Sequence, residues 1–77
     1  MEDLIRKILT EKIKDSSIAV EGGEAKYTVK VVSDIFKDKT MIERHKIIYA
    51  ALDSYIKSGE IHALTIKSLT IDESNNT

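Results

Sequence analysis

The spacing of hydrophobic residues changes period several times along this chain, and the order of these periods restricts the fold more than any other feature. Residues 2–14 place apolar side chains at spacings of one, three and four, which predicts a helix with one apolar face. Residues 17–21 and 25–32 show the short runs typical of strands, so we expect an antiparallel hairpin. Its turn is predicted at residues 22–25, where a glycine pair permits positive φ. Three side chains of the second strand alternate onto one side: Tyr27, Val29 and Val31.

The next part of the chain predicts a short helical turn followed by a long helix. Ser33 is placed to cap a turn over residues 33–36. Thr40 and Glu43 have the spacing of a capping box, which predicts the start of a helix of about 18 residues. Gly59 ends this helix as the residue after its cap. The apolar stripe of the long helix is predicted to contain Met41, Ile48, Leu52, Tyr55 and Ile56.

The last elements complete a two-layer arrangement. Residues 61–69 predict a third strand, and residues 70–73 have the pattern of another capped turn. Residues 74–77 contain no apolar anchor and are expected to form a flexible tail, which leaves residues 1–73 as one domain. Three strands cannot close a sandwich, but two helices can cover one face of them. The predicted fold is therefore α+β, with a three-stranded mixed sheet and the order α-β-β-α-α-β.

The composition limits the functions that this chain can perform by itself. A chain of 77 residues builds one small core, and with no cysteine it has neither a disulfide nor a thiolate ligand. The absence of cysteine fits a reducing compartment. No apolar run reaches the length of a signal segment or a bilayer span, so we expect a cytoplasmic protein without a membrane partner. With 12 basic and 13 acidic residues, the chain lacks the net positive charge of a protein that binds nucleic acid over its whole surface.

Motifs for catalysis are missing from the sequence. The run Gly22-Gly23-Glu24 lacks the lysine and the following helix of a phosphate-binding loop. Neither a nucleophile–histidine–acid set with supporting local signatures nor a metalloprotease histidine motif is present. The chain is also small for a deep substrate pocket. We therefore predict that it is not an enzyme.

His62 is the first candidate for a functional side chain, because it opens the predicted third strand near the rim of the sheet. An imidazole there is reachable from one side, which suits a metal ligand that needs a neutral nitrogen and an open approach. The alternative is a half-buried structural histidine that bonds a nearby carbonyl. The residues alone leave both interpretations open.

A second candidate is the basic segment at the start of the long helix. Its members are Lys37, Lys39, Arg44, His45 and Lys46. Such a run of charges is usually a solvated face, and His45 has the default role of packing at the edge of the core or bonding at the helix start. The functional alternative is a site for an anion, a nucleic acid or an acidic protein partner.

Three stretches of the sequence resemble the BolA family. They are residues 31–36 (VVSDIF), residues 44–52 (RHKIIYAAL) and residues 61–67 (IHALTIK). The resemblance implies a fold related to the type II KH domain. It also implies a partnership with a monothiol glutaredoxin, in which the two proteins share a [2Fe–2S] cluster or form an apo complex during iron–sulfur cluster maturation and iron homeostasis. In such a complex His62 is a cluster ligand, while the glutaredoxin supplies a cysteine and glutathione supplies a thiolate.

The resemblance also raises two alternatives. Family members that bind clusters tightly often carry a cysteine or histidine between the first two strands, whereas the loop of this chain offers only Glu24, and carboxylates match iron–sulfur centres poorly. The second ligand is therefore Glu24, water, another group or absent, and a labile or apo complex is expected. Some BolA-like proteins are regarded as transcriptional regulators and as stress or morphology factors, so DNA binding through the basic segment is the competing hypothesis. A third is an interaction domain with structural histidines.

Overall fold

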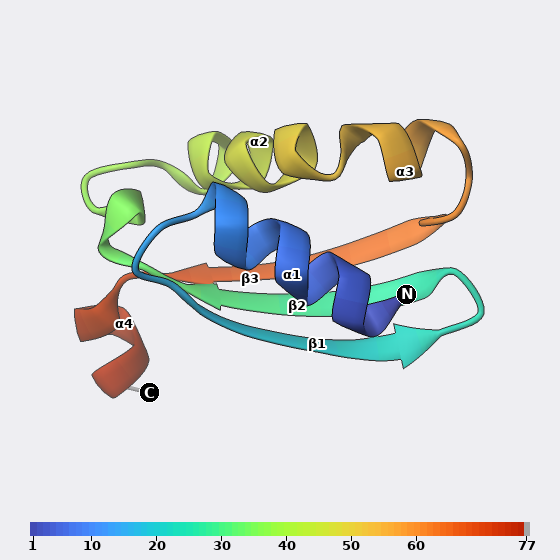
Figure 1. The fold of residues 1–77 in the computed structure, drawn as a ribbon. Coiled ribbons are helices and arrows are strands. Elements are labelled where there is room, and N and C mark those ends of the chain that lie inside the picture. Colours follow the sequence, from blue (N-terminus) through green and yellow to red (C-terminus); the bar gives the residue numbers. More distant parts are fainter. Residues whose placement is uncertain (77) are drawn as a thin grey trace.

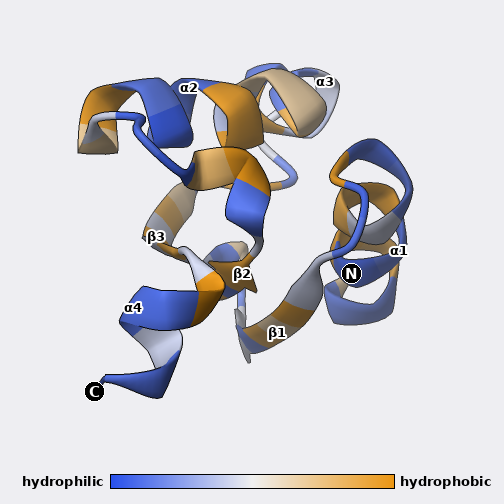
Figure 2. Cartoon of the chain, turned by 90° about the vertical axis from the view of Figure 1, so that its left-hand side faces the viewer, coloured by the Kyte–Doolittle hydropathy of each residue, from blue (hydrophilic) through white to orange (hydrophobic). Residues whose placement is uncertain are grey.

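The computed structural model, which describes residues 1–76, places two main helices on one face of a three-stranded sheet (Figure 1). Figure 2, a view turned by 90°, shows the same two layers. The elements in chain order are α1 (Glu2–Lys12), β1 (Ser17–Gly23), β2 (Lys26–Val32), η1 (Asp34–Phe36), α2 (Met41–Ala51), α3 (Asp53–Lys57), β3 (Ala63–Leu69) and α4 (Ile71–Asn75). The predicted class and order are confirmed.

The sheet is mixed and has the order β1-β2-β3. β1 pairs with β2 antiparallel, whereas β2 pairs with β3 in parallel, so β1 and β3 are the two edges. Helix α1 packs on β1, and α2 contacts both α1 and β3. Val29 on β2 lies between Val20 and Ile66 on its neighbours, which centres the core under the two helices. The predicted inward side of β2 is buried, as are these core side chains from other elements: Ile5, Leu9, Ile13, Phe36, Ile48, Leu52 and Ile61.

The hairpin turn differs from the prediction. β1 continues through Gly23, which pairs with Lys26, so the turn consists of Glu24 and Ala25. Both residues have positive φ, 55° and 67°, as the central residues of a type I′ turn do. Gly22 lies inside the strand with a φ of 129°, and a Cβ there would overlap the carbonyl oxygen of Lys26. Glycine is therefore required in β1 for close approach of the backbone, not for the turn.

The predicted long helix is interrupted at Leu52. This residue has φ −107° and ψ 11°, and its N–H donates to the carbonyls of both Ile48 and Tyr49, which tightens the chain between α2 and α3. The predicted capping box is confirmed, with the amide of Thr40 bonded to the carboxylate of Glu43 at 2.8 Å. Met41 was assigned to the buried stripe but is 54% exposed, because Arg44 takes the inward position on this first part of α2.

The ends of the elements also shift in two places. α1 ends at Lys12 rather than at residue 14, because Ile13 adopts an extended conformation that carries its side chain into the core. The capped turn after β3 is confirmed as α4, which continues through Asn75 and so includes residues assigned to the flexible tail. Thr77 lies outside the described residues, and the limit of the domain at residue 73 stays a prediction. No helix within residues 1–76 has the length and apolar character needed to cross a bilayer.

Candidate functional site

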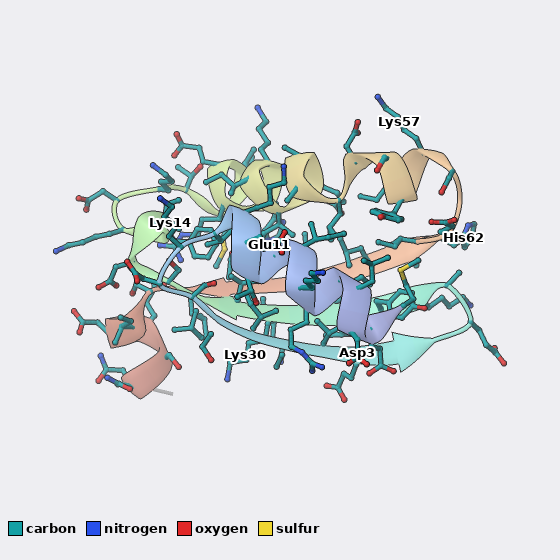
Figure 3. All side chains as sticks on the ribbon, viewed as in Figure 1. Asp3, Glu11, Lys14, Lys30, Lys57 and His62 are labelled. Atoms are coloured by element: carbon teal, nitrogen blue, oxygen red, sulfur yellow. The ribbon has the colours of Figure 1, made fainter. Side chains whose placement is uncertain are left out.

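His62 lies at the end of the molecule where the chain passes from α3 into β3 (Figure 3). The strand begins at Ala63, so His62 precedes it rather than opening it. Its side chain is exposed, and within residues 1–76 its imidazole has no hydrogen bond or ion pair. The interpretation of His62 as a half-buried side chain bonded to a carbonyl is therefore wrong for this structure.

The backbone around His62 is held firmly although the ring is exposed. The N–H of His62 donates to the carbonyl of Ala25 at 2.7 Å, and the N–H of Ala63 donates to the same oxygen at 3.1 Å. The N–H of Ile61 donates to the carbonyl of Tyr55 at 3.0 Å, while the Ile61 side chain is buried in the core. These contacts fix the backbone of residues 61–63, while the imidazole of His62 remains exposed to solvent.

The hairpin turn lies beside His62, because Ala25 is both a turn residue and the acceptor of the His62 amide. The neighbouring residue Glu24 is exposed, so the two sequence-predicted ligands lie at the same end of the sheet. No group of three or more histidine, cysteine, aspartate or glutamate side chains in residues 1–76 is arranged to hold a metal ion. This end of the chain offers an exposed imidazole nitrogen and an exposed carboxylate on the adjacent turn, but within residues 1–76 it does not enclose a metal centre by itself.

The predicted basic surface is only partly formed. Lys37 and Lys46 are exposed, and Lys39 and His45 are half-buried. Arg44 is only 6% exposed, and this corrects its assignment to that surface. His45 has no hydrogen bond among the described residues and lies at the flank of α2, which agrees with packing at the edge of the core.

The guanidinium of Arg44 joins α2 to the end of β3 and to α4. Its Nε donates to the carbonyl of Lys39 at 3.0 Å, and Nη1 donates to the carbonyl of Ser68 at 3.1 Å. Nη1 and Nη2 also contact the two carboxylate oxygens of Glu73 at 2.7 and 3.3 Å. The hydrogen bonds from Arg44, followed by the one from the Thr70 amide, lower the pKa of Glu73 from 4.5 to about 2. Arg44 is therefore a structural residue.

Glu73 was not singled out as a partner of Arg44 from the sequence. A signal was present, because Arg44 stands four residues before Ile48 on the inward side of the helix, where a charged side chain needs a partner. The structure also separates the two candidate regions. The start of α2 lies near η1 and α4 at one end of the molecule (Figure 1), whereas His62 lies at the other end (Figure 3).

Comparisons with known proteins agree on one family. The family model described as BolA-like protein matches residues 4–73. A BolA-like protein of Dictyostelium discoideum is 31% identical over 80 residues, covering 91% of this chain and 70% of the relative. Protein BOLA2 of Arabidopsis thaliana is 39% identical over 70 residues, covering 86% and 73%. The structure of a BolA protein homologue from Coxiella burnetii has a TM-score of 0.85 at 29% identity and covers 97% of this chain and 96% of that one.

Proposed function

Because the chain belongs to the BolA-like protein family, we propose that it is a non-enzymatic adaptor that binds a monothiol glutaredoxin and lends His62 to a shared [2Fe–2S] cluster. The observation that carries this proposal is the exposed imidazole of His62, which has no partner within residues 1–76 and sits on a backbone fixed by Ala25 and Tyr55. We propose that residues 1–73 perform this role in the cytoplasm, during iron–sulfur cluster maturation.

The donor set of this chain fits a shared cluster and not a resident one. With no cysteine and no enclosed group of ligands in residues 1–76, the chain can supply one neutral nitrogen to iron whose thiolates come from the glutaredoxin and glutathione. The imidazole has to be unprotonated to act as a ligand. Exposure of the ring lets the partner reach it without unfolding any part of this chain.

Glu24 has a secondary role in this proposal. It is close in sequence to the acceptor of the His62 amide, but a carboxylate is a hard ligand and matches a soft iron–sulfur centre poorly. We therefore assign His62 as the principal ligand from this chain and expect a labile holo complex. Replacing Glu24 with alanine should change the lifetime of the cluster less than replacing His62 does.

The test is anaerobic reconstitution of a [2Fe–2S] cluster on a monothiol glutaredoxin with glutathione, in the presence of this protein. The visible circular dichroism spectrum and the lifetime of the cluster should change when wild-type protein is added, and these changes should be lost with His62→Ala. His45→Ala is the matched control, because it removes the other histidine at the far end of the molecule. If His62→Ala behaves as wild type does in both measurements, the ligand assignment is wrong.

DNA binding receives less support from the geometry. In the basic segment, Arg44 is buried in contacts with Ser68 and Glu73, and Lys39 and His45 are half-buried. A titration of labelled duplex at low and moderate salt distinguishes the two functions, because phosphate contacts weaken steeply with salt. Salt-sensitive binding that survives His62→Ala would favour the regulatory function.

A further inference from the structure

β3 is an edge strand whose outer side remains open over part of its length. The carbonyl of Leu69 accepts from Ser33 and the amide of Ala63 donates to Ala25, so odd-numbered residues of β3 bond toward β2. Backbone groups alternate along a strand, which directs those of Leu64, Ile66 and Ser68 away from the sheet. Arg44 caps the outward carbonyl of Ser68, whereas no hydrogen bond among residues 1–76 is assigned to the outward groups of Leu64 and Ile66. An open stretch of edge is a template for another strand.

An apolar overhang covers one side of this open edge. The apolar first turn of α2 extends beyond β3 on the side away from β2 (Figure 2). Its side chains Met41 and Ile42 are 54% and 70% exposed, which is unusual for residues of this size. A groove of about 330 Å³ lies at this edge and is lined by Met41 of α2 and by these residues of β2 and β3: Lys30, Ile66, Lys67, Ser68 and Leu69.

The other side of the same edge is positively charged. Lys30 and Lys67 are direct neighbours across β2 and β3 and lie on the sheet face opposite α1 and α2. Figure 3 shows Lys30 pointing away from the helices. Neither lysine forms an ion pair in the part of the chain that the structure describes. Adjacent like charges destabilise a sheet, and an acidic side chain placed beside them would relieve this repulsion.

We propose that β3 binds an extended segment of a partner protein as an additional strand, and that this segment alternates aliphatic and acidic side chains. Successive side chains of a strand point to opposite faces, so the aliphatic ones would lie under Met41 and the acidic ones beside Lys67. Main-chain hydrogen bonds would form with Leu64 and Ile66. A second copy of this chain fits less well, because each copy would bring an α2 turn into the space beside the shared edge.

The first experiment uses a labelled peptide of about six residues, the usual length of a strand, with alternating glutamate and valine. Its binding is followed by fluorescence anisotropy, and amide hydrogen exchange is measured by NMR on the wild-type protein. We expect slower exchange at the amides of Leu64 and Ile66 when the peptide is added. Absence of binding, or protection confined to β1, would overturn the proposal. Protection at Leu64 and Ile66 that increases with protein concentration without peptide would assign the edge to a second copy instead.

The second experiment reverses the charge. Lys67→Glu should weaken binding of the glutamate–valine peptide about tenfold, a change worth about 1.4 kcal/mol, and should strengthen binding of a lysine–valine peptide. Lys7→Glu makes the same charge change on the exposed surface of α1 and should alter neither affinity. Equal effects of the two substitutions would show that only net charge matters, which would refute a site at β3. Neither variant touches His62, so this result is independent of the proposed cluster role.

Discussion

Replacing Arg44 with methionine should destabilise the fold strongly, although the substitution keeps an apolar stem over Phe36. The guanidinium carbon lies 5.9 Å from the centre of the Phe36 ring, so part of this contact survives. The hydrogen bonds to the carbonyls of Lys39 and Ser68 and to the carboxylate of Glu73 are all lost. Each buried acceptor left without a donor costs about 1–3 kcal/mol. The contacts to Ser68 and Glu73 join the start of α2 to the end of β3 and to α4, which lie 24 and 29 residues further along the chain.

The size of the loss follows from how exposed each partner is. Removing one partner of a buried ion pair costs about 3–5 kcal/mol, but the side chain of Glu73 is 46% exposed and is partly rehydrated, so we take the lower end. Ser68 is only 1% exposed, and its carbonyl is the partner that water reaches least. We expect Arg44→Met to lower the free energy of unfolding by about 3 kcal/mol. For a domain of this size, that corresponds to a fall in Tm of about 12–24 °C.

The assay is urea denaturation followed by far-UV circular dichroism, with thermal denaturation as a second measurement. Lys46→Met is the matched control, because it makes the same kind of change at an exposed position of α2 and should alter stability by less than about 0.5 kcal/mol. If Arg44→Met lowers the free energy of unfolding by less than about 1 kcal/mol, the reasoning is refuted, since water would then satisfy the acceptors of Arg44 as well as the guanidinium does.

Two further predictions concern stability, and each follows from one local feature. The folded-state pKa of Glu73 is lowered from 4.5 to about 2, so the stability that its charged form contributes is present above about pH 4.5 and is lost as the pH falls toward 2. Glu73→Gln should therefore flatten the dependence of the urea midpoint on pH in this window. An unchanged slope would contradict the assignment. Gly22→Ala should cost at least about 2 kcal/mol in the same denaturation assay, because φ is 129° and the added Cβ would lie 2.9 Å from the Cα of Tyr27. Gly23→Ala is its control, since a Cβ there meets nothing within 4 Å, and similar losses for both would refute the steric explanation.

Much of the fold is encoded in local patterns that can be read in the sequence. The alternation of Tyr27, Val29 and Val31 predicts the buried side of β2, and the spacing of Thr40 and Glu43 predicts the capping box. Both features depend on residues a few positions apart, so tertiary contacts do not change them. The same holds for the short turn capped by Ser33, whose hydroxyl accepts from the amide of Ile35.

The incorrect predictions depend on three features that hydrophobic periodicity does not describe: a close backbone approach, a break within a helix and a contact between distant segments. The close approach of Lys26 requires glycine at position 22, so the glycine pair belongs to β1 although its composition is typical of a turn. The long helix is interrupted at Leu52, where one N–H donates to the carbonyls of both Ile48 and Tyr49, although the predicted apolar stripe continues through this residue. The burial of Arg44 depends on Glu73, which lies 29 residues further along the chain. Local periodicity cannot encode a partner at that distance.

Arg44 and His62 differ in whether their side-chain polar atoms are used within the fold. Arg44 is buried with every polar atom bonded, so its chemistry is used within the fold and is not available to a partner. The imidazole of His62 is exposed and has no hydrogen bond or ion pair within residues 1–76, although the backbone of this residue is held by its bond to Ala25. Removing its ring should therefore leave the free energy of unfolding almost unchanged, because no packing or hydrogen bond is lost. Any change that His62→Ala produces in cluster binding then reports on ligation and not on folding, which makes this position the sharpest point at which to test the proposed adaptor role.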